Sequence, residues 1–189
     1  MTNQMQCQVC GAEMPHHLGR KPKFCGTKCR VKSHRGHHIP VELRQLPRWI
    51  RHRSKVPITA QGNSASSTNP LTWTDYQTAS TATVGDGLGF VLNGDGIVCI
   101  DLDHCFDGRP NAEAQALIDS LPDTYIEVSP SGSGLHIWAY AALEKGRRFN
   151  RNGLSVEIYP NGRYLTVTGQ AVNRVPFAHI ELDDILAQS

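Results

Sequence analysis

The sequence predicts an α+β fold in which an antiparallel sheet with flanking helices follows a small cysteine-rich module. Strand-length apolar segments recur between residues 87 and 167 and are interrupted by one amphipathic helix, a pattern typical of such a sheet. Four cysteines fall within the first 29 residues. No apolar run approaches the roughly 18 residues of a membrane-spanning helix, and the polar N-terminus lacks the apolar core of a signal peptide. We therefore expect a cytoplasmic protein with two domains, residues 1–38 and 39–189.

The N-terminal cysteines form two close pairs. Two residues separate Cys7 from Cys10, three separate Cys25 from Cys29, and fourteen lie between the pairs. Such pairs supply the four thiolates that tetrahedral structural zinc needs from a short chain. Disulfides and free thiols are the alternatives, and the lack of a secretion signal disfavours disulfides. The spacing thus predicts a structural Zn²⁺ site in residues 1–38.

Basic residues are concentrated in the first third of the chain. Residues 1–55 hold 12 Lys/Arg and 2 Asp/Glu, a net charge of +10, whereas the remainder holds 7 and 15, a net charge of −8. This asymmetry favours attraction to a polyanion, because each phosphate contact made by Lys or Arg releases counterions. A solvated basic face without a ligand is the alternative. The predicted nucleic-acid contacts are Arg20, Lys21, Lys23, Lys28, Arg30, Lys32 and Arg35.

Two helices are expected before the sheet. Residues 40–53 carry apolar side chains at helical spacing, although Pro47 would interrupt or start that helix. Residues 70–79 begin with a proline, which suits a first helical turn. The polar stretch 59–69 between them predicts a loop.

From residue 87 onward the expected order is two strands, a helix and four further strands. The segments 87–92 and 96–103 flank Asn93-Gly94-Asp95, a turn signal that predicts a hairpin between them. Residues 112–121 place their apolar side chains on one side of an amphipathic helix. The later strands are predicted at 124–128, 135–140, 154–159 and 163–167, and a short helix is predicted at 181–186.

Polar residues in three of these segments indicate a site. Asp101 and Asp103 end an apolar strand, and the two-residue period of a strand puts both carboxylates on one face. Such a pair can hold a divalent metal, although an isolated Asp-x-Asp more often binds nothing. The Ser/Gly-rich turn from Ser129 leads into a strand with His136, and its N–H and hydroxyl groups suit phosphate oxygens. Glu157 adds a single carboxylate on a later strand.

These motifs, in this order, resemble those of the archaeo-eukaryotic primase superfamily. They stand here as Ile100-Asp-Leu-Asp-His104, Ser129 to His136, and Val156 to Gly169. The resemblance is to the bifunctional DNA primase-polymerase domains of phage and plasmid type, and it covers residues 45–170. It implies a primase-polymerase catalytic core with an RRM-like antiparallel sheet, which here follows an N-terminal zinc finger.

The resemblance also implies nucleotidyl transfer by a two-metal mechanism. Two Mg²⁺ or Mn²⁺ ions would be held by oxygen ligands, one activating the attacking 3′-oxygen and the other bridging the triphosphate. The expected catalytic residues and metal ligands are Asp101, Asp103 and Glu157. The expected nucleotide-binding residues are Ser131, Ser133, His136, Arg163 and Lys55.

The predicted function is template-dependent synthesis or extension of primers on single-stranded DNA during phage or plasmid replication. The substrates would be NTPs or dNTPs, and the location would be the cytoplasm of a bacterial host. No Gly-x4-Gly-Lys-Ser/Thr motif is present, so a separate replicative helicase is an expected partner. The alternatives are a non-catalytic DNA-binding replication protein and a metal-dependent nuclease. The intact set of acids argues against a non-catalytic protein. The Ser/Gly turn argues against a nuclease, because such a turn suits a triphosphate and a nuclease would not need it.

Overall fold

The computed structural model of the protein describes residues 5–6, 13–14, 26–27 and 38–187. The chain divides into two compact units, Met1–His38 and Ile39–Ser189. In the first unit, β1 (Met5–Gln6) pairs antiparallel with β2 (Glu13–Met14). All the predicted zinc ligands and nucleic-acid contacts lie outside the described residues, so they stay predictions. They are Cys7, Cys10, Cys25, Cys29, Arg20, Lys21, Lys23, Lys28, Arg30, Lys32 and Arg35.

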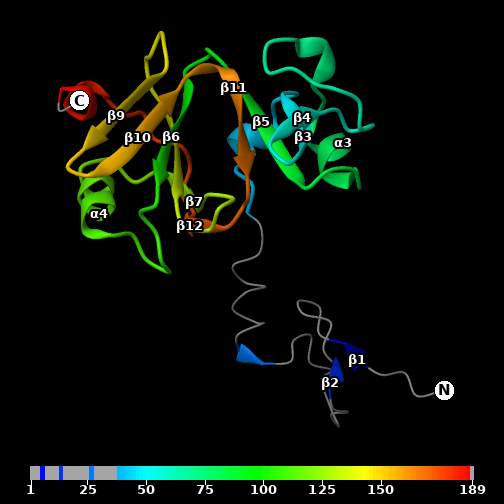
Figure 1. Ribbon diagram of the computed structural model, residues 1–189, viewed down its shortest axis with the longest axis horizontal. Coiled ribbons are helices and arrows are strands. Elements are labelled where there is room, and N and C mark those ends of the chain that lie inside the picture. Colours follow the sequence, from blue (N-terminus) through cyan, green and yellow to red (C-terminus); the bar gives the residue numbers. More distant parts are fainter. Residues whose placement is uncertain (1–4, 7–12, 15–25, 28–37, 188–189) are drawn as a thin grey trace. The chain divides into compact units, whose positions relative to one another are not determined.

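The second unit contains two antiparallel sheets (Figure 1). The six-stranded sheet has the order β12-β7-β8-β6-β10-β9, and the four-stranded sheet has the order β11-β5-β3-β4. The larger sheet consists of β6 (Ile97–Asp103), β7 (Tyr125–Val128), β8 (Leu135–Tyr140), β9 (Arg147–Arg151), β10 (Leu154–Tyr159) and β12 (Ala171–Asn173). The smaller consists of β3 (Trp49–Arg53), β4 (Val56–Ile58), β5 (Gly87–Asn93) and β11 (Asn161–Val167).

The centre of the larger sheet is a split β-α-β unit. The chain runs from β6 through α4 (Ala112–Asp119) to β7, and β8 then pairs antiparallel with both strands. Strand β10 adds to the other edge of β6. The order β7-β8-β6-β10 is consistent with the RRM-like core that the resemblance implies. The predicted α+β class with antiparallel pairing is confirmed.

Strand β6 separates two apolar cores, because consecutive side chains of a strand point to opposite faces. Ile100 and Leu102 belong to the core that includes side chains of α4 and of α5 (Asp183–Leu186). Cys99 belongs to the second core, to which both sheets contribute. There the rings of Phe90 and Trp138 meet edge to face, with their centroids 6.0 Å apart. The two sheets are thereby fixed against each other along the β6–β8 face.

The predicted helix over 40–53 was wrong beyond its first turn. Helix α2 spans only Val41–Arg44, and the chain enters β3 at Trp49. Pro47 stops the helix, because proline has no N–H to donate and clashes with the preceding turn. The Trp49 indole then donates to the Leu43 carbonyl oxygen at 3.0 Å, which joins the short helix to the strand. Tertiary packing thus overrides the helical spacing of the apolar residues.

The hairpin predicted between β5 and β6 was also wrong. Strand β5 pairs with β3 and β11, whereas β6 pairs with β8 and β10, so the turn carries the chain from one sheet to the other. Gly94 and Gly96 both have positive φ angles, of 76° and 91°, which the sharp change of direction requires. Arg48 holds the turn through an ion pair with Asp95 at 2.7 Å.

The second predicted helix is split. A 3-10 turn, η1 (Pro70–Thr72), is followed by α3 (Tyr76–Thr81). Between them, Thr74 exchanges two backbone hydrogen bonds with Trp49, at 2.8 and 2.9 Å. Asp75 then caps α3 by accepting from the Thr78 N–H at 2.8 Å. In the part of the chain that the structure describes, no helix has the length and apolar character needed to cross a membrane.

Candidate active site

A row of five polar residues crosses the larger sheet. Glu127 pairs with His136, His136 with Asp101, Asp101 with Glu157, and Glu157 with Arg148, on the successive strands β7, β8, β6, β10 and β9. Directly paired residues point to the same face of a sheet, so all five side chains share one face. The two ends of the row differ in exposure: Glu127 is 0% exposed, whereas the Arg148 side chain is 76% exposed. We call this set the polar row.

Asp101 lies in the middle of the polar row among other carboxylates. Its pKa is raised, first by burial and then by the charges of Asp103 and Glu157, although His136 and Lys55 act in the opposite direction. Asp103 follows two residues later on the same face and is exposed at the end of β6. The structure therefore brings Asp101 and Glu157 together, with Asp103 beyond them at the surface.

Glu157 is held by two partners. Its Oε1 lies 2.9 Å from Nε of Arg148, and its Oε2 accepts a hydrogen bond from the Tyr159 hydroxyl. Burial, together with Glu157, raises the pKa of Tyr159 to about 12, which keeps that hydroxyl a donor at neutral pH. The Arg163 guanidinium lies over the Tyr159 ring, 4.5 Å from its centroid. Arg163, predicted to bind nucleotide, is thus next to the polar row and exposed.

The His136 ring lies between two carboxylates. Its Nε2 is 3.6 Å from Oδ1 of Asp101 and its Nδ1 is 3.5 Å from Oε1 of Glu127. These separations exceed those of well-formed hydrogen bonds, so the attraction is mainly coulombic. Burial lowers the pKa of His136, but the two carboxylates outweigh it and the net shift is upward. His136 is only 3% exposed, so it acts on the row from beneath the surface.

Glu127 is one of two residues of the row, with Arg148, that the sequence analysis missed. It is fully buried, and its carboxylate accepts from the Gly169 N–H at 2.8 Å, the Tyr125 hydroxyl at 3.2 Å and the Trp138 indole at 3.4 Å. The signal was present: a glutamate within the apolar strand Tyr125–Val128, directly before the Ser/Gly turn. Burying a carboxylate without a partner is energetically costly, so a glutamate in an apolar strand usually has a hydrogen-bonding or charged partner.

The Ser/Gly turn is pinned beside the end of β6. A Cβ atom at Gly134 would lie 2.4 Å from the Leu102 carbonyl oxygen, so only glycine fits there. The Phe106 N–H donates to the Ser133 carbonyl oxygen at 2.9 Å, tying the turn to the segment that follows Asp103. The hydroxyls of the three serines form a chain with separations of 3.0 and 3.1 Å, from Ser129 to Ser131 to Ser133. Ser131 is exposed and Ser133 is half-buried.

Lys55 comes from the other sheet. It follows Ser54 in the two-residue turn between β3 and β4. Both residues have left-handed φ angles, 47° at Ser54 and 66° at Lys55. The Tyr164 hydroxyl on β11 donates to the Lys55 carbonyl oxygen and supports the turn. Among the charges that act on the pKa of Asp101, that of Lys55 has the smallest effect and lowers it.

Within the ranges that the structure describes, no group of three or more His, Cys, Asp or Glu side chains is arranged to hold a metal ion. The polar row explains this, because Glu157 is engaged by Arg148 and Tyr159 and Asp103 lies further along the face. Of the described cysteines, Cys99 and Cys105 are free thiols and both are buried. The predicted ligands are therefore neighbours on one face rather than a closed cluster.

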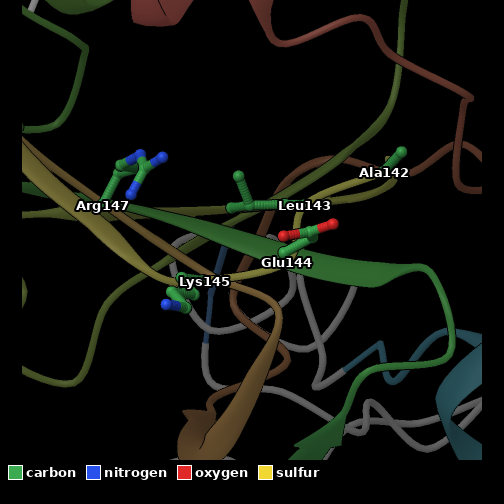
Figure 2. A pocket seen from close by; sticks show the side chains of 5 residues that line it. All are labelled: Ala142, Leu143, Glu144, Lys145 and Arg147. Atoms are coloured by element: carbon green, nitrogen blue, oxygen red, sulfur yellow. The ribbon is translucent and has the colours of Figure 1, made fainter.

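An open pocket lies elsewhere, at the connection between β8 and β9. Figure 2 shows the side chains of Ala142, Leu143, Glu144, Lys145 and Arg147 around it. None of these residues belongs to the polar row or to the predicted nucleotide site. The chemistry of the row, rather than this pocket, therefore defines the candidate active site.

Comparison with known proteins places the chain in a family. Residues 30–181 match the family described as bifunctional DNA primase/polymerase, N-terminal (Prim-Pol). The chain belongs to this family. Over 133 residues it is 38% identical to a DNA primase-polymerase of Nitratiruptor phage NrS-1, and the match covers 65% of this chain and 18% of the phage protein. The chain thus corresponds to a small part of the length of that relative.

Proposed function

We propose that the chain is the catalytic unit of a primase-polymerase, which starts or extends primers on single-stranded DNA by template-dependent nucleotidyl transfer during phage or plasmid replication. The observation that carries the proposal is the polar row, in which Asp101 and Glu157 are paired across two strands of a Prim-Pol family domain. The phage relative carries the name of this activity, which supports the assignment.

Divalent ions would suit the residues of this face. Carboxylate oxygens are the ligands that Mg²⁺ and Mn²⁺ prefer. Burial is the main cause of the raised pKa of Asp101, and the charges of Asp103 and Glu157 add to it, so a bound cation would favour the ionised form. Asp101, Asp103 and Glu157 would hold the ions, and a bound pair would supply charge neutralisation at the attacking 3′-oxygen and the triphosphate. Without bound ions, Arg148 pairs with Glu157 and limits the repulsion between Glu157 and Asp101.

The incoming nucleotide would lie over the exposed part of the same face. Exposed Ser131 and half-buried Ser133 offer hydroxyls, and Lys55 and Arg163 offer cations from the other sheet. His136 would act from below rather than as an exposed donor, because its ring is buried between Glu127 and Asp101. Glu127 orients that ring. Substrate binding is thus proposed to use both sheets, with NTPs and dNTPs both candidates.

The N-terminal module would engage the template. We propose a structural Zn²⁺ held by the four N-terminal cysteines, which would order the basic residues around them for contact with single-stranded DNA. A replicative helicase would open the duplex.

Nucleotide incorporation by the purified chain tests the proposal. Primed and unprimed single-stranded DNA would be incubated with NTPs or dNTPs and Mg²⁺ or Mn²⁺, in parallel with the Asp101→Ala/Asp103→Ala variant and an Asp123→Ala control at an exposed site. Lengthened products from wild type and control, absent from the double variant, are expected. Shortened primers would indicate a nuclease instead, and DNA binding without any product would indicate a non-catalytic replication protein.

A further inference from the structure

Tyr159 contacts two residues of the candidate site with two different parts of its side chain. Its hydroxyl donates a hydrogen bond to Oε2 of Glu157, and its ring lies under the Arg163 guanidinium, with Cζ of the arginine 4.5 Å from the ring centroid. Glu157 is a proposed metal ligand and Arg163 is a proposed nucleotide contact. The proposed function gives the tyrosine that joins them no role.

The Tyr159 ring is seated where the chain leaves the larger sheet. Strand β10 ends at Tyr159, and β11 of the smaller sheet begins two residues later. Side chains two residues apart on a strand share a face, so Tyr159 lies on the face of the polar row beside Glu157. It is half-buried and packs against the core to which both sheets contribute. A Cβ atom at Gly146 would lie 3.2 Å from Cδ1 of the ring, so this glycine leaves the ring its room.

A β-bulge at the start of β11 directs Arg163 over this ring. The pairing register of β11 with β5 shifts between Asn161 and Tyr164, as an extra residue in one strand requires. Gly162 lies within the bulge and has a left-handed φ angle of 68°. Its carbonyl oxygen accepts a hydrogen bond from the Ser67 hydroxyl at 2.9 Å, which supports the bulge from the preceding loop. Bulges change the direction in which neighbouring side chains point, and they are common next to active sites.

We propose that Tyr159 is a positioning residue that aligns the metal-binding and triphosphate-binding parts of the site through two separable contacts. The inference rests on the proposed function. The hydroxyl would hold the Glu157 carboxylate in place for a divalent ion, because a hydrogen bond from outside the ligand set fixes the orientation of a metal ligand. The ring would hold the Arg163 guanidinium, because a cation is attracted to an aromatic face. A guanidinium stacked in this way still presents its N–H groups to phosphate oxygens.

Two binding measurements on the full chain separate the contacts. Electron paramagnetic resonance of free Mn²⁺ would give the Kd for the ion. Calorimetry in excess Mn²⁺ would give the Kd for inorganic tripolyphosphate, which carries the triphosphate charge and cannot be polymerised. Tyr159→Phe removes only the hydroxyl, whereas Tyr159→Leu removes the hydroxyl and the ring, and Tyr159→Met replaces the leucine variant if that one does not fold. The matched control is Tyr140→Phe, which removes a hydroxyl from another half-buried tyrosine outside the polar row.

Tyr159→Phe is expected to weaken Mn²⁺ binding by about 10-fold and to leave the Kd for tripolyphosphate unchanged. Tyr159→Leu should show the same loss for Mn²⁺ and should also weaken tripolyphosphate binding by about 2- to 5-fold. Arg163→Gln should weaken tripolyphosphate binding alone, and adding Tyr159→Leu to it should cause no further loss of that affinity. The control keeps both wild-type affinities.

Equal losses of both affinities in Tyr159→Phe and Tyr159→Leu would show a merely structural role and would overturn the inference. Wild-type affinities in both variants would overturn it as well. So would tighter Mn²⁺ binding by Tyr159→Phe, because the hydroxyl would then compete with the ion for Glu157 instead of orienting it.

Primer extension run in parallel separates this inference from the proposed function. If wild type extends primers while the Tyr159 variants match the control in both affinities, the positioning role fails and the proposed function stands. If wild type extends nothing, the proposed function fails, and the two affinities still decide whether Tyr159 positions its neighbours. Wild type that binds neither Mn²⁺ nor tripolyphosphate would overturn both.

Discussion

The Oε1 atom of Glu127 lies 3.5 Å from Nδ1 of His136, and both side chains are almost completely buried. The opposite nitrogen of the same ring faces Asp101 at 3.6 Å. A charged residue absent from the recognised motifs is therefore coupled, through one imidazole, to the carboxylate in the middle of the polar row. Orientation of His136 by Glu127 parallels the outer-shell carboxylates that orient histidines in other catalytic sites.

Glu127→Gln is expected to lower the extension rate while leaving the fold intact. The amide oxygen can still accept from the Gly169 N–H, but the negative charge that raises the pKa of His136 is lost. The His136 pKa should fall in an NMR titration, and extension should slow by about 10–100-fold. Glu144→Gln, at an exposed position, serves as the control. An unchanged rate with an unchanged His136 pKa would show that Glu127 is purely structural.

Asp101→Asn is expected to stabilise the metal-free protein. Burial and neighbouring acids raise the pKa of Asp101, so its ionised form destabilises the fold at neutral pH, and that cost is lost as the pH falls through the folded-state pKa. The metal-free Tm should rise by a few degrees, at roughly 2–4 °C per kcal/mol for a chain of this size. Added Mn²⁺ should raise the Tm of wild type and of Asp123→Asn but not of Asp101→Asn. An equal response of all three would contradict the metal assignment.

Gly134→Ala is expected to displace the Ser/Gly turn. The added methyl group would meet the Leu102 carbonyl oxygen, a backbone atom that cannot move aside, so stability should fall by about 1–3 kcal/mol and KM for nucleotide should rise. Gly153→Ala is the comparison, because Gly153 has a positive φ angle of 88° but open space around it. It should lose only about 1 kcal/mol and keep its KM. Denaturant unfolding and steady-state kinetics measure both effects, and identical behaviour of the two variants would refute the steric argument.

Cys25→Ser is expected to remove zinc and weaken template binding. Elemental analysis should find about one Zn²⁺ per wild-type chain, as four thiolates in two close pairs require, and none in the variant. DNA affinity should fall by the same factor in the variant as in wild type treated with a strong chelator. A variant that keeps its zinc would exclude Cys25 as a ligand.

The sequence predicted the local part of this structure better than the long-range part. The bounds of β8 and β10 are those expected, because a glycine directly precedes each of these strand-length segments and because apolar and polar residues alternate in β10. The predicted pairing of β5 with β6 was wrong, and β5 pairs with β3 and β11 instead. The turn Asn93-Gly94-Asp95 specifies a change of chain direction but not which strands pair. The segment that forms β3 was predicted to be helical because its apolar residues have helical spacing. What fixes it as a strand is the packing of Trp49 against residues distant in the sequence, which the local sequence does not show.

The candidate site shows the same division. Motif order led to Asp101, His136 and Glu157, and the structure brings these three into register on adjacent strands. Glu127 was missed because it joins the site only through its pairing with His136 across β7 and β8, and a short sequence motif does not show which strands pair. The roles of the site residues stay predictions until they are measured.

A crystal structure of the chain with Mn²⁺ and a non-hydrolysable nucleoside triphosphate tests the central claim most directly. Anomalous scattering would locate the ions without reference to any assumed ligand. The account predicts Mn²⁺ bound by Asp101, Asp103 and Glu157, with the triphosphate against Ser131, Ser133, Arg163 and Lys55. Ions bound away from the polar row, with Glu157 still paired to Arg148, would contradict it.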